Sequence, residues 1–227
     1  MYKYYQIIKS LRIKKGHSQE FISDKINCSR STYIEFEKGN KDLSFSQILK
    51  LSNMLGISID ELSAGEISQY DKYKEMILAF IRFGGSKDKK IVKTKLAKML
   101  YLADFSWFYE KTNSMSGMQY RKIQYGPVPN DFFVALNDLE ESGDINIDHK
   151  SEIFLISETE TSERMNKLKM LNKEETDLVK KIAKKWKNKT TKEIVNFTHK
   201  QFPYSICENK EIIPYELIIQ EDPGNVY

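Results

Sequence analysis

Residues 18–39 read SQEFISDKINCSRSTYIEFEKG, and this stretch predicts two short helices joined by a tight turn. Ser18 is placed to cap a first helix that runs to Ile26, because a serine oxygen at the N-cap accepts a backbone N–H that the helix leaves open. Ser29 is placed in the same way to cap a second helix over residues 30–38. We therefore expect this helix pair to organise a small helical domain.

The spacing within this pair suits DNA recognition in the major groove. One helix must lie across the phosphates and hold a second helix in the groove, which requires a short turn and apolar anchors on the buried face. Phe21, Ile22 and Ile26 are expected to anchor the first helix. Tyr33 and Phe36 are expected to anchor the second. The pattern is typical of a helix-turn-helix module.

The flanking sequence predicts three further short helices, so that residues 1–66 form a five-helix domain. An apolar stripe marks the helix that precedes the pair. Two capping boxes follow the pair, each a serine with Gln or Glu three residues later. They are residues 44–47 (SFSQ), opening a helix near 46–54, and residues 58–61 (SIDE), opening a helix near 59–63.

The small, polar segment 63–69 marks a domain boundary, and we expect a second domain over residues 67–227. Its apolar patterns predict a helix-rich α+β fold that contains a small β-hairpin. The expected elements are helices near 92–110, 132–142, 173–187 and 191–200, a strand at 119–125, and a hairpin from 145–148 and 152–156.

Residues 18–39 and 55–62 (LGISIDEL) closely resemble the XRE/Cro family of phage-repressor-like helix-turn-helix domains, in register over 4–63. The resemblance implies a lambda-repressor-like fold that binds double-stranded operator DNA as a homodimer. It places Gln19 at a phosphate-binding helix start and Arg30, Ser31 and Glu35 at base edges. The full set of DNA-contact positions that it implies is Gln19, Ser29, Arg30, Ser31, Thr32, Glu35, Asn40 and Lys41.

The charge of the first domain is low for a DNA-binding module. Residues 1–66 contain ten Lys or Arg and eight Asp or Glu, a net charge of +2. Glu35 and Glu37 on the reading helix repel phosphate unless they pair or meet a base donor. We expect Glu37 to be internal and to hold the turn after the helix. A domain that mediates only protein contacts is the alternative.

Two segments stand out in the second domain. Residues 94–109 (TKLAKMLYLADFSWFY) form a helix with aromatic residues on more than one side, so some of them are expected to line a contact surface as well as the core. Residues 119–130 (QYRKIQYGPVPN) contain Pro127 and Pro129, which hold the chain stiff and extended. A rigid loop can present a preformed binding surface at low entropic cost. A purely structural corner is the alternative.

Together these segments resemble the Panacea domain, also called the SocA-like antitoxin domain, over about 71–217. Lys95-Leu96, Met99-Leu100-Tyr101 and Ile213-Pro214-Tyr215-Glu216-Leu217 also match its pattern. The resemblance implies an antitoxin that binds a toxin encoded next door and brings no catalytic residues. The implied toxin-binding positions are Tyr101, Asp104, Phe105, Phe108, Tyr120, Tyr125, Gly126, Pro127, Val128 and Pro129.

Residues 180–192 carry seven lysines and no acidic residue. Leu178, Ile182 and Trp186 recur at i, i+4 spacing, which predicts an amphipathic helix with a dense basic face. Such a face is usually solvated. It can also follow DNA beside an operator or meet an acidic partner.

Composition and motifs exclude several other classes. Of 227 residues, 40% are hydrophobic and 30% charged, which excludes collagen and gross disorder. No apolar run approaches the length of a membrane helix, which is about 20 residues. The N-terminus lacks an apolar signal region. Two cysteines fit reduced thiols in the cytoplasm. No zinc motif or Gly-rich phosphate loop occurs, so we expect no metal, no cofactor and no enzyme.

We therefore expect a cytoplasmic, DNA-binding antitoxin of a two-gene toxin–antitoxin system. It would neutralise its cognate toxin by direct binding and repress its own operon as a homodimer. Three alternatives stay open: a phage or mobile-element transcriptional regulator, a proteolytic adaptor, and an enzyme with an unrecognised site.

Overall fold

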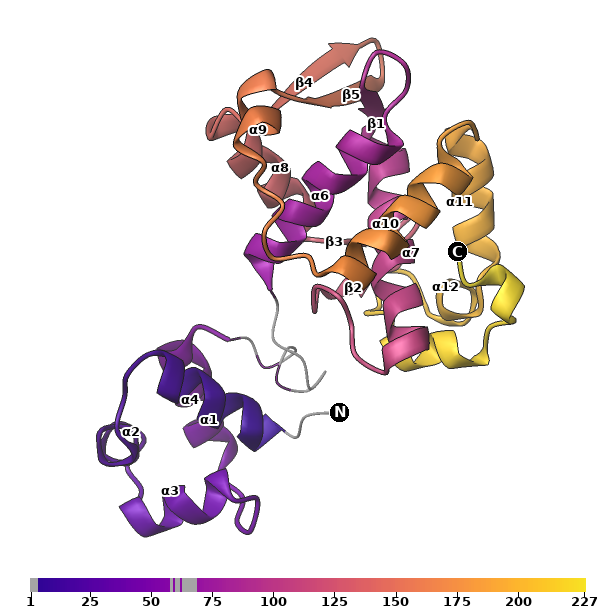
Figure 1. The fold of residues 1–227 in the computed structure, drawn as a ribbon. Helices are drawn as coiled ribbons and strands as arrows, with labels where there is room; N and C mark the ends of the chain where they lie inside the picture. Colours follow the sequence, from indigo (N-terminus) through magenta and orange to yellow (C-terminus); the bar gives the residue numbers. More distant parts are fainter. Residues whose placement is uncertain (1–3, 58, 60–61, 63–68) are drawn as a thin grey trace. The chain divides into compact units, whose positions relative to one another are not determined.

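The computed structural model describes residues 4–57, 59, 62 and 69–227, and the chain divides into two compact units, Met1–Ile67 and Ser68–Tyr227 (Figure 1). Each unit has a hydrophobic core of its own. Both are mainly helical, and the C-terminal unit adds small antiparallel sheets. The expected fold class is confirmed. Among the described residues, no helix combines the length and the apolar character needed to cross a bilayer.

The helices of the N-terminal unit begin where the sequence carries caps. Ser18, Ser29 and Ser44 each accept a hydrogen bond from the backbone N–H three residues later. The helix that Ser44 opens ends at Gly56, whose φ of 68° is the left-handed conformation that glycine adopts without strain. The helices are α1 (Tyr4–Lys14), α2 (Gln19–Lys25), α3 (Arg30–Glu37) and α4 (Phe45–Leu55).

The core of this unit joins α2 and α3 largely as predicted. Ile22, Tyr33 and Phe36 are each 0% exposed. The prediction for Phe21 is wrong, because its side chain is 41% exposed and stacks on the His17 ring with centroids 4.8 Å apart. Successive helical residues point about 100° apart, and α2 buries Ile22 and Ser23, so Phe21 on the other side of Ile22 points out of the core.

One predicted element falls outside the described part of the chain. The capping box at 58–61 and the fifth helix near 59–63 lie there, apart from Ile59 and Leu62. Leu62 is buried in the same core as α2 and α3.

The long helix α7 is central to the C-terminal unit. Every residue from Lys95 to Phe108 is buried, because other elements cover this helix on several sides. The predicted helices near 92–110, 132–142, 173–187 and 191–200 are confirmed. The helical elements that pack on α7 (Lys93–Lys111) include α6 (Tyr70–Gly84), α10 (Lys173–Trp186), α11 (Thr191–Lys200) and the 3-10 turn η1 (Tyr215–Gln220), whereas α8 (Asp131–Glu141) packs on α6 (Figure 1).

A three-stranded antiparallel sheet lies beside these helices in the order β1-β5-β4. The predicted hairpin is β4 (Ile145–Lys150) and β5 (Ile153–Glu158), with Ile147 opposite Ile156. The edge strand β1 (Lys90–Val92) was not predicted. Its three residues are too few for an alternating pattern, so only pairing with β5 identifies it as a strand.

The predicted strand at 119–125 is shorter than expected. Only β2 (Tyr120–Arg121) is formed, and it pairs with β3 (Val128–Pro129). Proline has no backbone N–H, so Pro127 and Pro129 limit the ladder at this end. The chain at 210–213 adds further pairing, with the Ile213 N–H donating to the Tyr120 carbonyl at 2.8 Å.

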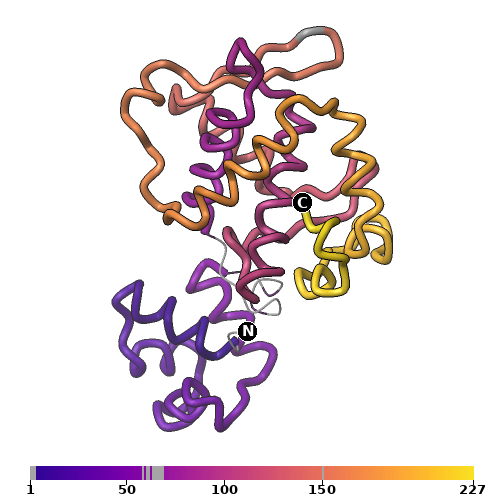
Figure 2. The backbone as a smooth tube through the Cα atoms, turned by 45° about the vertical axis from the view of Figure 1, so that its right-hand side comes forward, coloured from indigo at the N-terminus to yellow at the C-terminus, as the bar shows by residue number. Residues whose placement is uncertain are grey.

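The end of the chain returns to pack on α7, as the yellow segment in Figure 2 shows. Tyr215 is buried against Phe105 and Phe108, with ring centroids 4.6 Å and 5.6 Å away. Its hydroxyl donates to the Met118 carbonyl at 2.6 Å. Four short helical elements of this unit were not predicted: α9 (Glu160–Met165), α12 (Phe202–Ile206), η1 and η2 (Pro223–Asn225).

Candidate functional site

The N-terminal turn of α3 presents an open polar surface. Ser29 caps the helix by accepting from the Thr32 N–H at 3.1 Å. Arg30 and Ser31 are exposed. Within the described residues, the Arg30 guanidinium makes no hydrogen bond or ion pair, so it is free to meet a base edge or a phosphate. An exposed helix start with a free guanidinium is what a recognition helix requires.

The C-terminal half of α3 differs from the arrangement that the sequence suggested. The Glu35 carboxylate accepts from Lys38 Nζ at 2.8 Å and from Asn40 Nδ2 at 3.0 Å. These hydrogen bonds lower the pKa of Glu35. Lys41 Nζ lies 3.3 Å from Thr32 Oγ1. Each Glu35 oxygen therefore already accepts one hydrogen bond inside the unit, and a contact with cytosine would use a remaining lone pair.

Glu37 is internal, as predicted, and its contacts tie α1, α2 and α3 together. It is 4% exposed. Its carboxylate accepts from Arg12 Nε at 2.6 Å, from Arg12 Nη2 at 3.0 Å and from Gln19 Nε2 at 2.9 Å. Burial raises the pKa of Glu37, but the hydrogen bonds from Arg12 and Gln19 outweigh it, so the net pKa is lowered.

Two consequences follow from this buried pair. Gln19 was placed at a phosphate contact, yet its side-chain amide N–H is used on Glu37. Arg12 was missed altogether, although it donates to the His17 carbonyl as well, at 2.8 Å. The only signal in the sequence was an arginine within the apolar stripe of the first helix.

In the C-terminal unit, four of the five aromatic residues of α7 that were considered for a second contact surface lie in the core instead. Tyr101, Phe105, Trp107 and Phe108 are at most 7% exposed and share one core. Tyr109 is partly buried against that core. A helix covered by α6, α10, α11 and η1 has an interior on several sides, so aromatic residues all round it are explained by packing. Tyr101, Phe105 and Phe108 therefore present little or no surface to a partner in this structure.

Asp104 and Tyr120, placed at the toxin contact by resemblance, form part of a buried polar network. Asp104 is 0% exposed. Its carboxylate accepts from the Ser116 N–H at 2.7 Å, from Ser116 Oγ at 2.5 Å and from Tyr120 Oη at 2.8 Å. Such a network holds the loop after α7 in one position. Its role is to fasten the chain that leads to the 125–130 loop.

A buried lysine holds the 125–130 loop in place by a hydrogen bond to its backbone. Lys98 is 2% exposed, and its ammonium donates to the Pro127 carbonyl at 3.1 Å. Gly126 has φ +98°, and a Cβ there would lie 2.8 Å from Lys98 Nζ and 2.9 Å from His199 Nε2. Only glycine fits this position without strain or a clash. Gly126, Pro127, Val128 and Pro129 are buried.

Burial lowers the pKa of Lys98 to about 7, whereas an unfolded lysine titrates near about 10.4. The free energy of unfolding should therefore rise with pH above pH 7, because the unfolded chain there binds more protons. We expect wild type to gain about 1–3 kcal/mol more than Lys98→Met between about pH 7 and about pH 9. Denaturant unfolding of both proteins measures this.

The exposed Lys87→Met is the matched control for Lys98 and should behave as wild type. His199 does not interfere, because burial and the nearby charges of Lys98 and Lys122 lower its pKa below 6.5. Equal pH dependence in wild type and Lys98→Met would show that Lys98 stays charged in the folded protein.

Three apolar side chains are exposed in this region, beside the exposed polar residues Gln124, Asn130 and Asp131. Tyr125 is 68% exposed directly before the buried loop, and it is the only one of the ten proposed toxin-binding residues that is exposed. Phe133 and Val134 on α8, just after the loop, are 48% and 53% exposed. Sequence reasoning missed both. Three consecutive apolar residues, 132–134, were the available signal, since a helix cannot bury all three on one face.

No group of three His, Cys, Asp or Glu side chains among the described residues is placed to hold a metal ion. Cys28 and Cys207 are both free thiols, and burial raises the pKa of each.

Comparison with known proteins bears on both units. Residues 8–62 match the helix-turn-helix family model. Residues 96–203 match the family model described as antitoxin SocA-like, Panacea domain. No solved structure matches the chain.

Two curated relatives from Bacillus subtilis (strain 168) share sequence with part of this chain. The SPbeta prophage-derived uncharacterized HTH-type transcriptional regulator YonR is 36% identical over 64 residues, which cover 28% of this chain and 59% of YonR. The uncharacterized HTH-type transcriptional regulator YqaE is 26% identical over 87 residues, which cover 37% of this chain and 75% of YqaE. The chain thus spans less than two thirds of the length of the first relative.

Proposed function

We propose that this chain, in which a helix-turn-helix domain precedes an antitoxin SocA-like Panacea domain, is a DNA-binding antitoxin. It binds an operator as a homodimer through α3 and represses its own operon. It neutralises a co-encoded toxin by direct binding through the Panacea domain. The observation that carries the proposal is the presence of both domains in one chain.

The mechanism that we propose is binding, with no catalysis. Dimerisation offsets the low charge of residues 1–66, because two half-sites double the number of phosphate contacts. Operator DNA lies in the cytoplasm of a bacterium, so we place the protein there. The toxin contacts the exposed apolar residues on either side of the buried segment 126–129, namely Tyr125, Phe133 and Val134. The buried residues 126–129 hold the backbone next to this surface in place.

The gene neighbouring this one, expressed alone and then with this protein, tests the antitoxin role through growth. Arrest that this protein relieves supports the proposal. Absence of arrest, or arrest without relief, favours a second candidate: a transcriptional regulator of a phage or mobile element. That candidate is favoured by the match to YonR, which is described as prophage-derived.

The two activities should separate by mutation. Arg30→Ala should weaken operator binding by roughly 10-fold, because a bidentate Arg–guanine pair contributes about 1–3 kcal/mol. It should leave growth rescue unchanged. Titration of operator DNA measures the first effect, and the exposed Lys9→Ala on α1 is the control. Equal loss of both activities in Arg30→Ala would contradict the division of labour.

The reciprocal variant is Tyr125→Ser with Phe133→Ser. It should lose growth rescue while operator binding stays at the wild-type level. Ile206→Ser with Ile219→Ser is a matched control, because these residues are 57% and 56% exposed elsewhere in the same unit. If the control fails to rescue and the Tyr125/Phe133 variant succeeds, the toxin surface lies elsewhere.

A further inference from the structure

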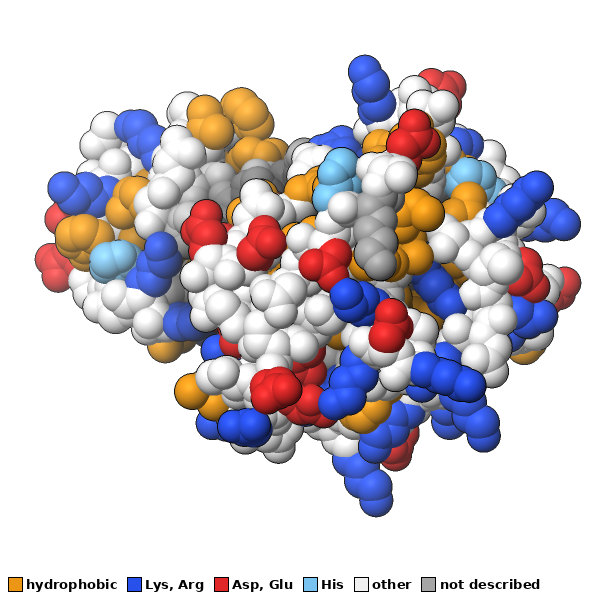
Figure 3. Space-filling model, turned by 90° about the horizontal axis from the view of Figure 1, so that it is seen from above, with side chains coloured by type: hydrophobic (Ala, Val, Ile, Leu, Met, Phe, Trp, Pro, Cys, Tyr) orange, Lys and Arg blue, Asp and Glu red, His pale blue; other side chains and the backbone are white. Residues whose placement is uncertain are grey.

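The exposed face of α10 carries the densest basic surface in the described part of the C-terminal unit. Its opposite face is buried through Leu178, Val179, Ile182, Ala183 and Trp186. Lysine and arginine side chains stand out from the protein surface in Figure 3, several of them grouped at the lower right. We define the α10 basic surface as Lys180, Lys181, Lys184 and Lys185 on α10, Lys187 and Lys189 directly after it, and Lys192 at the start of α11, all of them exposed.

Most of this charge is not neutralised within the described residues. Lys189 pairs with Glu193 at 3.3 Å. Lys185 donates to the carbonyl oxygen of Tyr227. Lys181, Lys184 and Lys187 make no ion pair or hydrogen bond with a described acidic side chain. A solvated surface of this kind attracts a polyanion.

The C-terminal end of α10 is also held in place by a further lysine. Lys95 is 8% exposed, and its ammonium donates to the carbonyls of Lys187 at 3.0 Å and Lys189 at 2.7 Å. A cation at the end of a helix satisfies carbonyls that the helix leaves open. The backbone that carries Lys187 and Lys189 is therefore fixed, and the basic surface keeps one shape.

The spacing of these lysines suits double-stranded DNA. Residues 180–187 span about 10 Å along the helix axis. Duplex DNA carries one negative charge per about 1.7 Å of its axis, so about six phosphates of the two strands together lie within that length. A linear row of cations on a rigid helix matches this linear array of phosphates.

An acidic protein fits the surface less well. Protein interfaces are depleted in lysine and depend on buried aromatic or arginine anchors. The lysines here are exposed, whereas the aromatic residue of the helix, Trp186, is 5% exposed and packs inward on Phe197. The same chain carries a helix-turn-helix domain, so DNA bound there is at high local concentration for α10.

We infer that the α10 basic surface is a second DNA-binding surface, which contacts the phosphate backbone of double-stranded DNA independently of sequence. It adds phosphate contacts to a helix-turn-helix unit whose own net charge over residues 1–66 is only +2. The inference goes beyond toxin neutralisation and does not depend on it.

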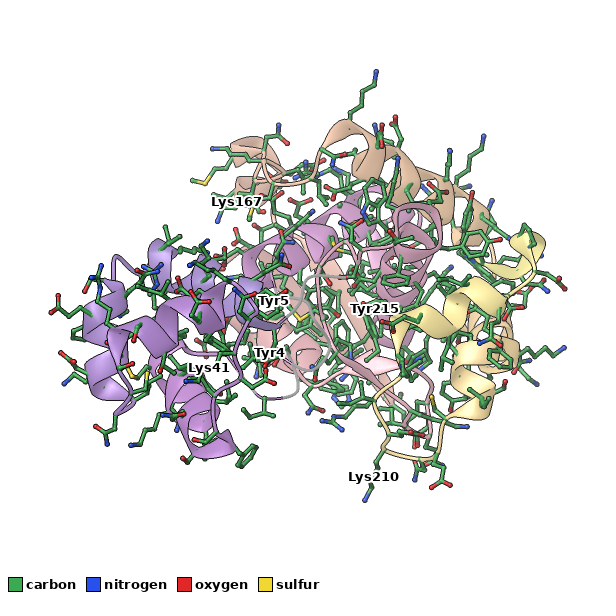
Figure 4. All side chains as sticks on the ribbon, turned by 90° about the horizontal axis from the view of Figure 1, so that it is seen from below. Tyr4, Tyr5, Lys41, Lys167, Lys210 and Tyr215 are labelled. Carbon is green, nitrogen blue, oxygen red and sulfur yellow. The ribbon has the colours of Figure 1, made fainter. Side chains whose placement is uncertain are left out.

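The test uses the full chain and a duplex of about 30 base pairs that lacks the operator, titrated between about 50 mM and 200 mM salt. The variant is the triple change Lys181→Gln, Lys184→Gln and Lys187→Gln. Glutamine has a helix propensity close to that of lysine, so α10 should persist. The matched control removes the same charge at exposed lysines elsewhere: Lys87→Gln, Lys169→Gln and Lys210→Gln. Lys210 projects into solvent in Figure 4.

We expect the α10 variant to bind the duplex at least about 10-fold more weakly at the lower salt concentration, with a salt slope smaller by about 2–3. The control should stay within about 2-fold of wild type, because its lysines are not grouped on one face. Circular dichroism and thermal melting establish that both variants are folded.

Two outcomes would overturn the inference. If the α10 variant and the control lose the same affinity, the effect is one of overall charge and the surface has no binding role. If duplex binding and its salt slope are unchanged but growth rescue is lost, the surface binds an acidic protein instead of DNA.

Discussion

Glu37→Ala is expected to unfold the N-terminal unit at temperatures where wild type is folded and so to abolish operator binding. Removing one partner of a buried ion pair typically costs about 3–5 kcal/mol, because the other charge is left buried and unpaired. Here the charge left unpaired would be the Arg12 guanidinium, whose Nε lies 2.6 Å from the Glu37 carboxylate in the wild type. Gln19 would also lose its acceptor. Hydrogen exchange of the α1–α3 amides measures the loss in this unit alone.

Glu35→Ala on the same helix is the matched control for Glu37. Its side chain is solvent-screened, so its loss should leave the exchange of these amides nearly unchanged. The double change Arg12→Met with Glu37→Leu should recover much of the stability, because apolar residues of similar volume can replace a buried pair. If Glu37→Ala exchanges as slowly as wild type, the pair does not hold the three helices together.

The lowered pKa of Glu37 also predicts the direction of acid unfolding. Its contribution to stability is present above the ordinary glutamate pKa of about 4.3 and is lost as pH falls through the lower folded value. Wild type should therefore lose protection of the α1–α3 amides below about pH 4, whereas the Arg12→Met, Glu37→Leu protein should lose less.

Asp104→Ala is expected to lower the free energy of unfolding of the C-terminal unit by about 3–5 kcal/mol. It removes three hydrogen bonds to a buried charge and leaves Ser116 and Tyr120 without an acceptor. Both tryptophans, Trp107 and Trp186, lie in this unit, so tryptophan fluorescence during denaturant unfolding reports on it alone.

Two further variants serve as a partial removal of the network and as a control for Asp104→Ala. Tyr120→Phe removes one of the three hydrogen bonds and should cost less, about 1–2 kcal/mol. The exposed Asp177→Ala on α10 should leave the midpoint of unfolding unchanged. A cost for Asp104→Ala no larger than that of Asp177→Ala would mean that the network is not needed for folding, and Asp104 would again be a candidate contact residue.

Much of the fold follows from local signals in the sequence. Ser18, Ser29, Ser44 and Asn172 predict helix starts because capping involves residues within one turn of each other. Helix periodicity likewise depends on residues three and four apart. The strand β1 and the extent of β2 were not predictable in this way, because a strand of two or three residues is defined by its partner.

In the candidate sites, too, some features follow from local sequence and others depend on residues distant in the chain. An exposed Arg30 at the start of α3 follows from the cap at Ser29 and the phase of the helix. That Glu35 is held by Lys38 and Asn40 depends on how the chain turns after the helix. The inward position of Phe105 depends on which elements surround α7, and no local pattern states that.

The sequence by itself determined that the chain has two dissimilar parts, that the first holds a helix-turn-helix pair, and that α10 has one apolar and one basic face. Each of these rests on spacing within one or two helical turns. Only the tertiary structure decided that Arg12 pairs with Glu37, that Lys98 supports Pro127, and that Tyr125 is exposed while residues 126–129 are buried. The physical reason is that burial and ion pairing depend on residues distant in sequence, and folding alone brings them together.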